Sequence, residues 1–321
     1  MLTHLFVVDP LGPIDISKDS SFALMLAAQA RGHRVFTCDT DGLFANGATA
    51  YAHCKPTQLQ AVRGAHFAEG AGQVLPLSAF ACVWMRKDPP FDMQYIAATY
   101  VLDLAPPATQ VFSRPAALRS WNEKTSVLHF PDLAPRSLLA RDMKQISAFQ
   151  REVGGSIVLK PLGYSGGNGI VALHPGDLNT RSLLEISTRH GKEFVLAQEY
   201  LPQVVQGDKR VIFVGSVARA GLLRIPPADD LRGNIHIGAT TVLSPLTARE
   251  QAICAVLGPR LVAAGHLFTG IDLIGEKVTE INVTSPTGLQ EIRDHGGPDL
   301  AEELIDAALA WPATPSGRTA I

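Results

Sequence analysis

Two oxygen-bearing side chains near the C-terminal end have the types and spacing of a metal site. Glu280 and Asn282 stand two residues apart, so on a strand both side chains would point to the same face. A carboxylate and an amide oxygen together suit Mg²⁺ that also contacts nucleotide phosphates. An ordinary hairpin with its polar face in water fits this pattern equally well.

Asp272, in the preceding apolar run, could supply a third oxygen ligand. The turn between the two runs is Gly275-Glu276-Lys277. If that turn has three residues, Asp272 pairs with Glu280 across the hairpin and all three oxygen donors converge. A two-residue turn would pair Asp272 with Thr279 instead. The metal hypothesis therefore requires the three-residue turn.

A glycine-rich loop follows Lys160, which ends an apolar strand. Four of the seven residues from Gly163 to Gly169 are glycine, and glycine tolerates the left-handed angles with which backbone N–H groups surround an anion. The loop is neither a Walker A loop nor a Rossmann turn, because no Gly-Lys-Ser/Thr closes it and a strand follows. It resembles a phosphate lid, although a plain mobile hairpin fits it too. Lys124, in a separate segment, could neutralise phosphates of the same nucleotide.

The elements that must position these residues form an α/β pattern. The first 120 residues alternate strand-like and helix-like runs, and polar residues such as Arg86 and Lys87 follow one strand where open sheets bind ligands. For these two residues a solvated loop is the reading that this pattern alone favours. We predict four segments: an N-terminal α/β domain at 1–120, a central unit with the glycine-rich lid at 121–203, a C-terminal unit with the metal hairpin at 204–311, and a flexible tail at 312–321.

Composition excludes several classes of function. The 321 residues carry 28 basic and 30 acidic side chains, so no electrostatic footprint for nucleic acid or a membrane surface exists. Four scattered cysteines without a zinc-ligand pattern indicate a reduced, cytoplasmic protein. The apolar start of the chain is too short for a signal peptide or a membrane span.

Taken in order, the motifs of this chain resemble those of the bacterial glutathione synthetases of the ATP-grasp superfamily, from about Leu5 to about Leu309. The motifs that carry the resemblance are KDSSFA from Lys18, MRKDPPFD from Met85, ATY from Ala98, NEK from Asn122, LKPL from Leu159, GDKRV from Gly207, RIP from Arg224, RGN from Arg232 and TEINVTSPT from Thr279. This resemblance implies an ATP-grasp fold preceded by a Rossmann-like preATP-grasp domain. It also implies a homo-oligomer, a tetramer or a dimer.

The resemblance further implies a role for each matching residue. Lys124 and Lys160 would hold ATP phosphates, the loop containing Gly163, Gly166 and Gly167 would close over them, and Asp208 would lie near the ribose. The residues Gln198, Glu199, Tyr200 and Leu201 would contact adenine. Asp272, Glu280 and Asn282 would bind Mg²⁺, with Mn²⁺ as an alternative. Arg210 and Arg224 would act in the active centre. The substrate would contact Arg86, Arg232, Asn234, Ser285, Pro286 and Thr287.

The implied reaction joins γ-glutamylcysteine to glycine through an acyl phosphate, with ATP as the energy source. Two lids, the glycine-rich loop and residues 226–239, would protect that intermediate from water. Two departures fall in these lids: Gly163-Tyr164 replaces a frequent Asp-Gly, and Gly238-Ala239 replaces a frequent Gly-Gly. A paralogous ligase with another donor or acceptor is therefore the nearest alternative. A non-catalytic nucleotide-binding module is a more distant one.

Overall fold

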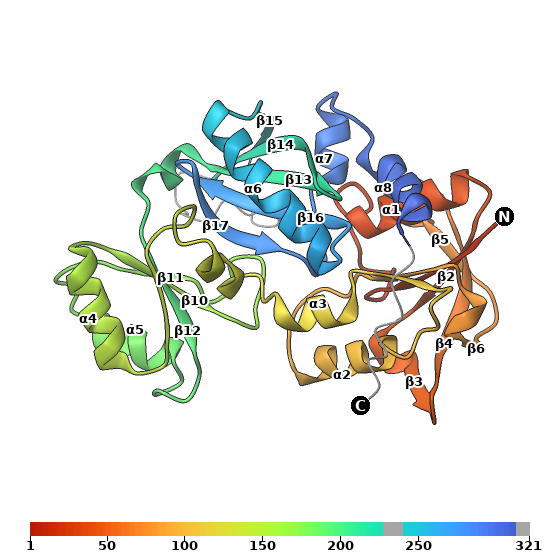
Figure 1. The fold of residues 1–321 in the computed structure, drawn as a ribbon, viewed down its shortest axis with the longest axis horizontal. Helices are drawn as coiled ribbons and strands as arrows, with labels where there is room; N and C mark the ends of the chain where they lie inside the picture. The colour runs from red at the N-terminus through yellow and green to blue at the C-terminus, as the bar shows by residue number, and fades with distance from the viewer. Residues whose placement is uncertain (227–239, 313–321) are drawn as a thin grey trace.

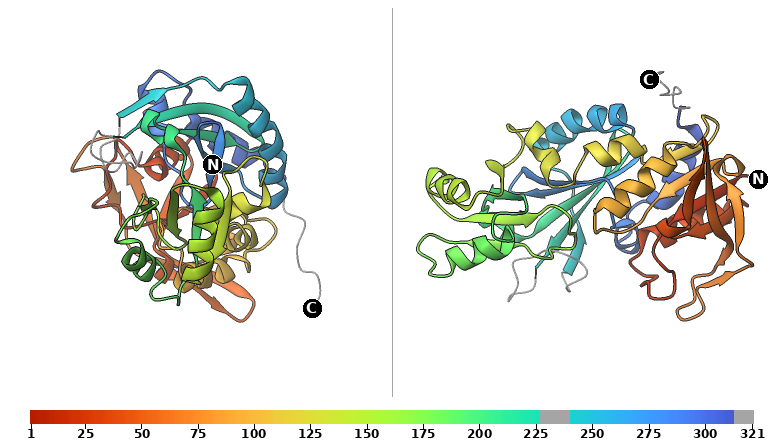
Figure 2. Two further views of the ribbon diagram at one scale, coloured as in Figure 1. Left: turned by 90° about the vertical axis from the view of Figure 1, so that its left-hand side faces the viewer. Right: turned by 90° about the horizontal axis from the view of Figure 1, so that it is seen from below.

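The computed structural model describes residues 1–226 and 240–312, and this part of the chain contains three β-sheets. The N-terminal sheet with its helices forms one end of an elongated molecule, and the central sheet forms the other end. The C-terminal sheet lies between them (Figures 1 and 2). Parallel and antiparallel strands are both present and helices pack on the sheets, so the fold is α/β (α+β), as the sequence predicts.

The N-terminal sheet is built around the buried strand β1 (Thr3–Val7). β1 pairs in parallel with β2 and β7, and β8 extends this parallel part, so their carboxyl ends meet at one edge. The other strands of the sheet are antiparallel. Its remaining elements are α1 (Ser20–Ala30), β2 (Arg34–Cys38), η1 (Thr40–Gly42), β3 (Leu43–Asn46), β4 (Thr49–Leu59), β5 (Phe67–Glu69), β6 (Gln73–Pro76), η2 (Leu77–Ala79), β7 (Cys82–Met85), α2 (Met93–Leu102), β8 (Gln110–Phe112) and α3 (Pro115–Ser120).

The central sheet has four antiparallel strands in the order β11-β10-β12-β9, with α4 and α5 packed on one face (Figure 1). Strand alternation divides its residues: Ile157 and Leu159 are buried under the helices, whereas Val158 and Lys160 point to the opposite face, which lines a cavity. The elements are η3 (Thr125–His129), β9 (Ser137–Ala140), α4 (Met143–Val153), β10 (Ile157–Pro161), β11 (Val171–Leu173), α5 (Thr180–Ser187), β12 (Val195–Glu199) and η4 (Pro202–Gln206).

The C-terminal sheet has five antiparallel strands in the order β15-β14-β13-β16-β17. α6 packs against this sheet and begins with a capping box formed by Thr247 and Glu250. α7 and α8 pack against α1 and thereby join this sheet to the N-terminal part. The elements are β13 (Asp208–Val214), β14 (Val217–Ile225), β15 (Thr240–Leu243), α6 (Ala248–Ala264), β16 (Phe268–Ile274), β17 (Lys277–Asn282), α7 (Leu289–Asp294) and α8 (Leu300–Ala310).

The hairpin of β16 and β17 has the predicted pairing but not the predicted turn. Ile274 pairs with Lys277, so the turn has two residues, both with positive φ. The prediction of a three-residue turn is therefore wrong. Asp272 nevertheless lies opposite Glu280, because the register shifts by one residue at Thr279 and forms a β-bulge. The bulge brings the two carboxylates to the same side of the hairpin.

Candidate active site

A cavity of about 450 Å³ lies between the central and C-terminal sheets. It combines charged side chains with an apolar wall from β10 and β11, which is the usual make-up of a nucleotide pocket. The predicted residues that line it are Lys124, Lys160, Gly166, Gly167, Gln198, Glu199, Tyr200, Leu201, Asp208, Arg210, Arg224, Asp272, Glu280 and Asn282. These residues come from segments far apart in the sequence, and only the fold brings them together.

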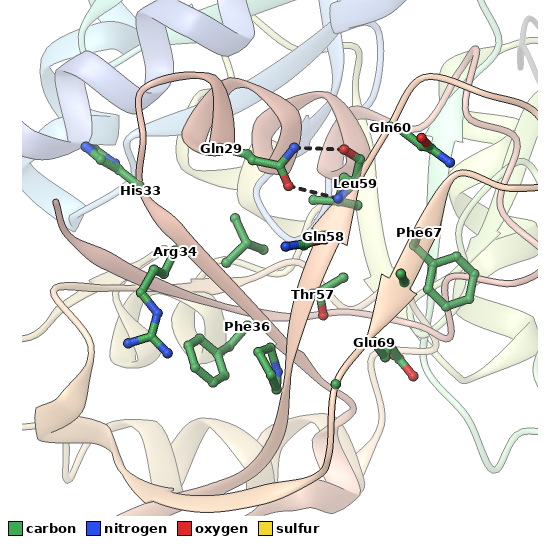
Figure 3. A pocket seen from close by; sticks show the side chains of 14 residues that line it. Gln29, His33, Arg34, Phe36, Thr57, Gln58, Leu59, Gln60, Phe67 and Glu69 are labelled. Carbon is green, nitrogen blue, oxygen red and sulfur yellow. Dashed lines mark hydrogen bonds between the residues drawn. The ribbon is translucent and has the colours of Figure 1, made fainter.

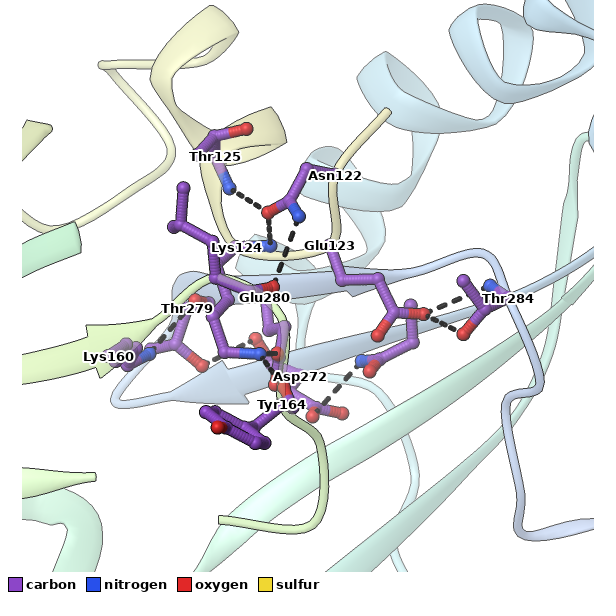
Figure 4. A network of polar contacts seen from close by, with 12 residues as sticks. Asn122, Glu123, Lys124, Thr125, Lys160, Tyr164, Asp272, Thr279, Glu280 and Thr284 are labelled. Atoms are coloured by element: carbon purple, nitrogen blue, oxygen red, sulfur yellow. Dashed lines mark hydrogen bonds and ion pairs between the residues drawn. The ribbon is translucent and has the colours of Figure 1, made fainter. Parts of the chain in front are cut away.

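The two predicted phosphate lysines both reach strand β17, at Thr279 and Glu280 (Figure 4). The Lys160 ammonium donates to Oε1 of Gln198 at 2.8 Å and to the carbonyl oxygen of Thr279 at 3.1 Å. Burial lowers the pKa of Lys160. The Lys124 ammonium lies 3.3 Å from Oε1 of Glu280 and donates to the carbonyl oxygen of Tyr164 in the glycine-rich loop. The pair therefore places two cations beside the same carboxylate.

Two arginines hold the Asp272 carboxylate. Arg210 donates to it from Nε at 2.5 Å and from Nη2 at 2.9 Å, and Arg224 Nη2 lies 3.0 Å away. Burial would raise the pKa of Asp272, but the two guanidinium groups outweigh burial and hold this pKa well below its usual range. Arg224 also forms a bidentate pair with Asp208, at 2.6 and 2.7 Å. These pairs fix both arginines at the wall of the cavity.

The oxygen donors fit a hard divalent cation that shares its coordination shell with phosphates. Asn282 donates from Nδ2 to Asp272 at 3.2 Å, which leaves its amide oxygen as an acceptor for a cation. Residues 1–226 and 240–312 contain no group of three or more His, Cys, Asp or Glu placed to hold a metal. Two carboxylates and one amide oxygen leave the remaining positions to phosphate oxygens and water, which is how Mg²⁺ is usually bound. Asp272 is engaged by two arginines and Glu280 by Lys124, so binding of a cation here would compete with these ion pairs, and the metal roles stay predictions.

Glu123 belongs to the NEK motif, but sequence reasoning assigned it no role. Its backbone oxygen accepts from the Ile281 N–H at 2.9 Å. Its Oε1 accepts from the N–H of Val283 and of Thr284 at 3.0 Å each, and from Oγ1 of Thr284 at 2.7 Å. Burial, followed by the charge of Glu280, raises the pKa of Glu123. Glu123 thus holds the end of β17 against the segment that carries Lys124 (Figure 4).

The predicted substrate residues that the structure describes do not line the cavity; they are Arg86, Ser285, Pro286 and Thr287. Arg86 is buried, and it donates to Oγ of Ser21 at 3.0 Å and to the carbonyl oxygen of Pro286 at 2.9 Å. The carbonyl oxygen of Thr287 accepts from Arg210 at 3.2 Å, and Ser285 donates to Asp88. Arg86 therefore supports the Ser285-Pro286-Thr287 turn, and direct contact with substrate stays a prediction.

Several predicted residues need separate comment. Gly163 lies next to the cavity, where its carbonyl oxygen accepts from the N–H of Phe91 at 2.9 Å. Arg232, Asn234 and Ala239 lie outside the described residues, as do nearly all of the second predicted lid and the predicted tail.

A larger concavity, of about 710 Å³, lies on the open part of the N-terminal sheet (Figure 3). At this concavity the side chain of Gln29 forms two hydrogen bonds with the backbone of Leu59. Its amide nitrogen donates to the Leu59 carbonyl oxygen at 2.7 Å, and its amide oxygen accepts from the Leu59 N–H at 2.8 Å. Arg34 and Glu69 are the charged side chains of its lining, and neither belongs to a cluster that could do chemistry. Volume alone therefore does not locate the active site, and the smaller cavity has the functional groups.

A nucleotide-sized cavity between two antiparallel sheets, with a lysine on one side and carboxylates on the other, defines an ATP-grasp protein. Solved structures agree with this class. The D-cycloserine synthetase DcsG matches with a TM-score of 0.67 at 14% identity, over 97% of this chain and 100% of that one. The ATP-grasp ligase PsnB, complexed with a minimal precursor, matches with a TM-score of 0.62 at 19% identity, over 96% and 98%.

Sequence comparison identifies the family. Residues 2–119 match the family model for the prokaryotic glutathione synthetase N-terminal domain, and residues 123–297 match that for the prokaryotic glutathione synthetase ATP-grasp domain. The glutathione synthetase of Agrobacterium fabrum is 42% identical over 94% of both chains, and that of Thermosynechococcus vestitus is 40% identical over 95% of this chain and 98% of its own. The chain belongs to the prokaryotic glutathione synthetase family, whose members are ATP-dependent ligases that use a divalent metal. The family resemblance of the motifs and the ATP-grasp prediction are thus confirmed.

Within the described residues, no helix is both long and apolar enough to cross a membrane.

Proposed function

We propose that this protein ligates γ-glutamylcysteine to glycine, with cleavage of ATP to ADP and phosphate and with Mg²⁺, or alternatively Mn²⁺, as the metal. The observation that carries the proposal is the convergence of Lys124, Lys160, Asp272, Glu280 and Asn282 in one cavity. Relatives of nearly the same length that are called glutathione synthetase support the choice of substrates.

The chemistry requires activation of a carboxylate, because its oxygen is a poor leaving group. The cysteinyl carboxylate of the dipeptide attacks the γ-phosphorus of ATP, a new O–P bond forms, and the bond to the departing ADP breaks. The glycine amine then attacks the carbonyl carbon, phosphate leaves, and the nitrogen loses a proton. Lys124 and Lys160 stabilise the negative charge that spreads over the transferred phosphoryl group. The metal, held by Asp272, Glu280 and Asn282, would neutralise phosphate charge and orient the phosphates.

Adenine would bind at the segment between the central and C-terminal sheets. The N–H of Glu199 donates to the Arg136 carbonyl oxygen at 2.8 Å, and the N–H of Tyr200 donates to that of Ser156 at 3.0 Å. The N–H of Leu201 donates no hydrogen bond within the described residues, so it is the donor that this segment offers to an adenine edge. The apolar side chains of Val158, Ile170 and Ala172, which line the cavity, would contact the two faces of the adenine ring.

The glycine-rich loop would close over the phosphates and exclude water from the acyl phosphate. Its Tyr164 carbonyl oxygen accepts from Lys124, so phosphate binding would replace this contact. Protection of the loop from proteolysis by ATP together with both substrates would support the lid role. Equal cleavage with and without ligands would contradict it.

The Gly163-Tyr164 departure keeps a paralogous ligase as the second candidate. ADP release should be measured with γ-glutamylcysteine and glycine, and with a panel of other acids and amines. We expect ADP release that requires both natural substrates and is abolished in Glu280→Ala. Faster turnover with another pair would favour the paralogous ligase, and ATP binding without ADP release for any pair would favour a non-catalytic module.

Two further features complete the proposal. The four cysteines are free and buried, which supports the prediction of a reducing, cytoplasmic environment. Homo-oligomerisation, as a tetramer or a dimer, stays a prediction that analytical ultracentrifugation would test.

A further inference from the structure

Glu291, on the short helix α7, is a buried carboxylate to which the proposed reaction gives no role. Its exposed fraction is 9%, and neither of its carboxylate oxygens has a hydrogen-bond partner within the described residues. An ionised carboxylate in this state costs free energy, because burial removes water without supplying a replacement. Burial accordingly raises the pKa of Glu291. Such a side chain suggests a ligand that supplies the missing positive charge.

The nearby cations do not fill this role. Lys18 and Arg210 are close enough to act on Glu291 electrostatically, but neither forms an ion pair with it in the described structure. Arg210 is committed to Asp272 and to the carbonyl oxygen of Thr287. Among the residues that the structure describes, no cation pairs with Glu291, so we consider a cation supplied by a bound ligand.

Glu291 lies within reach of the reacting centre. A Cβ added to Gly288, which precedes α7, would lie 3.8 Å from Cγ of Arg210. Glu291 is one helical turn beyond Gly288, about 5 Å along the axis, and helical side chains lean back toward the N-terminus. The N-terminal end of α7 also contacts the start of α1, where the Leu289 N–H donates to Oγ of Ser20 at 3.3 Å. Helix α7, which carries Glu291, thus lies between Arg210 of the reacting centre and α1 of the N-terminal domain.

We propose that Glu291 binds the α-ammonium group of the γ-glutamyl residue of the dipeptide substrate. This inference rests on the proposed function. An extended γ-glutamylcysteine spans roughly 10 Å from its cysteinyl carboxylate to its ammonium group. A substrate of this length can bridge the reacting centre and α7, because Arg210 is close enough to Glu291 to act on it electrostatically. The glycine amine does not fit this role, because it must be unprotonated and adjacent to the acyl phosphate when it reacts.

The test compares two acyl-donor substrates, γ-glutamylcysteine and N-glutarylcysteine, with the wild-type enzyme and with Glu291→Gln. N-Glutarylcysteine has the shape of γ-glutamylcysteine but lacks the α-amino group. Wild-type kcat/KM should fall about 10- to 100-fold with this analogue, as expected for loss of a charged hydrogen bond. Glu291→Gln should lose a similar factor with γ-glutamylcysteine, should no longer discriminate between the two donors, and should keep its KM for ATP.

Asp294→Asn is the matched control, because Asp294 is an exposed acid on the same helix. It should retain the wild-type preference, which separates a specific contact from a general change in charge. Glu291→Gln should melt at or above the wild-type Tm, because Glu291 has no hydrogen-bond partner to lose.

Equal use of both donors by the wild type would overturn the inference, and that measurement needs no variant to fold. Unchanged discrimination in a folded Glu291→Gln enzyme would also overturn it. Failure of the proposed function would look different: the wild type would release no ADP with γ-glutamylcysteine and glycine.

Discussion

Replacement of Glu123 tests how strongly the active site depends on a residue that touches neither nucleotide nor metal in our proposal. In Glu123→Ala, the N–H groups of Val283 and Thr284 and the hydroxyl of Thr284 lose their shared acceptor. Each unsatisfied buried donor costs about 1–3 kcal/mol. Water entering the vacated space and relief of repulsion with Glu280 offset part of this cost. We therefore expect a loss of about 3 kcal/mol in the free energy of unfolding.

Activity should fall more steeply than stability. The freed segment directly follows Asn282 and leads into the Ser285-Pro286-Thr287 turn, and a displacement of about 1 Å at an active site can cost 10²-fold in rate. Glu123→Gln is the informative comparison, because its amide oxygen can accept the same three hydrogen bonds without the charge. We expect it to remain within about 1 kcal/mol of wild-type stability and within about tenfold of wild-type kcat.

The assays are urea unfolding and steady-state ADP release, each with Mg²⁺ titrated. Glu152→Ala serves as a control, because Glu152 is exposed and pairs with Arg136 at the surface. Wild-type stability or wild-type kcat in Glu123→Ala would refute the positioning role. Equal damage from Gln and Ala would show that the charge, rather than the hydrogen-bond acceptor, is what matters.

Three further predictions concern other parts of the molecule. Lys160→Met should lower kcat by about 100-fold or more, since a cation facing the phosphates is lost. Its circular dichroism spectrum should match that of the wild type, and wild-type turnover would exclude a role for this lysine. Gly258→Ala should lower the free energy of unfolding by about 3 kcal/mol, because the new Cβ would lie 2.1 Å from the carbonyl oxygen of Ser216. Gly12→Ala is the control: its Cβ meets nothing within 4 Å, so its thermal melt should change little. Burial lowers the pKa of His4 to about 4, below its ordinary 6.5, so its contribution to stability should be complete above pH 6.5 and should fall by about 3 kcal/mol as the pH drops to 4. In urea titrations His4→Gln should flatten this pH dependence, and an unchanged slope would contradict the assignment.

The hairpin of β16 and β17 illustrates how far sequence reasoning extends. Alternation along the chain correctly placed Glu280 and Asn282 on one face of the strand. The pairing of Asp272 with Glu280 was predicted from a three-residue turn; the turn length was wrong, and a bulge produced the pairing instead. The bulged residue, Thr279, donates from Oγ1 to the Asp272 carbonyl oxygen at 3.1 Å and accepts from Lys160. A lysine from another sheet thus contacts the bulge, and no local pattern reveals such a contact.

Arg86 shows a different limit. Its position after a strand correctly placed it at the carboxyl edge of the N-terminal sheet, next to the C-terminal sheet. Its burial, its hydrogen bond to Pro286 and its stacking 4.8 Å over Phe268 depend on residues about 180 to 200 positions away in the chain. A sequence pattern can place a charge at an edge, but it cannot tell whether that charge meets substrate or protein.

The amino-acid sequence sets the chemical groups of this protein and the local order in which they occur. Lysine, carboxylate and amide types, the glycine-rich loop and the strand alternation are local properties that suggested phosphate and metal chemistry. The ATP-grasp fold and the family followed from the resemblance of the ordered motifs to a known family. Tertiary structure decided which groups meet and which remain unpaired, as for Glu123, with its three donors, and for Glu291, with none. The physical reason is that burial and pairing depend on the positions of distant segments, whereas residue type and spacing do not.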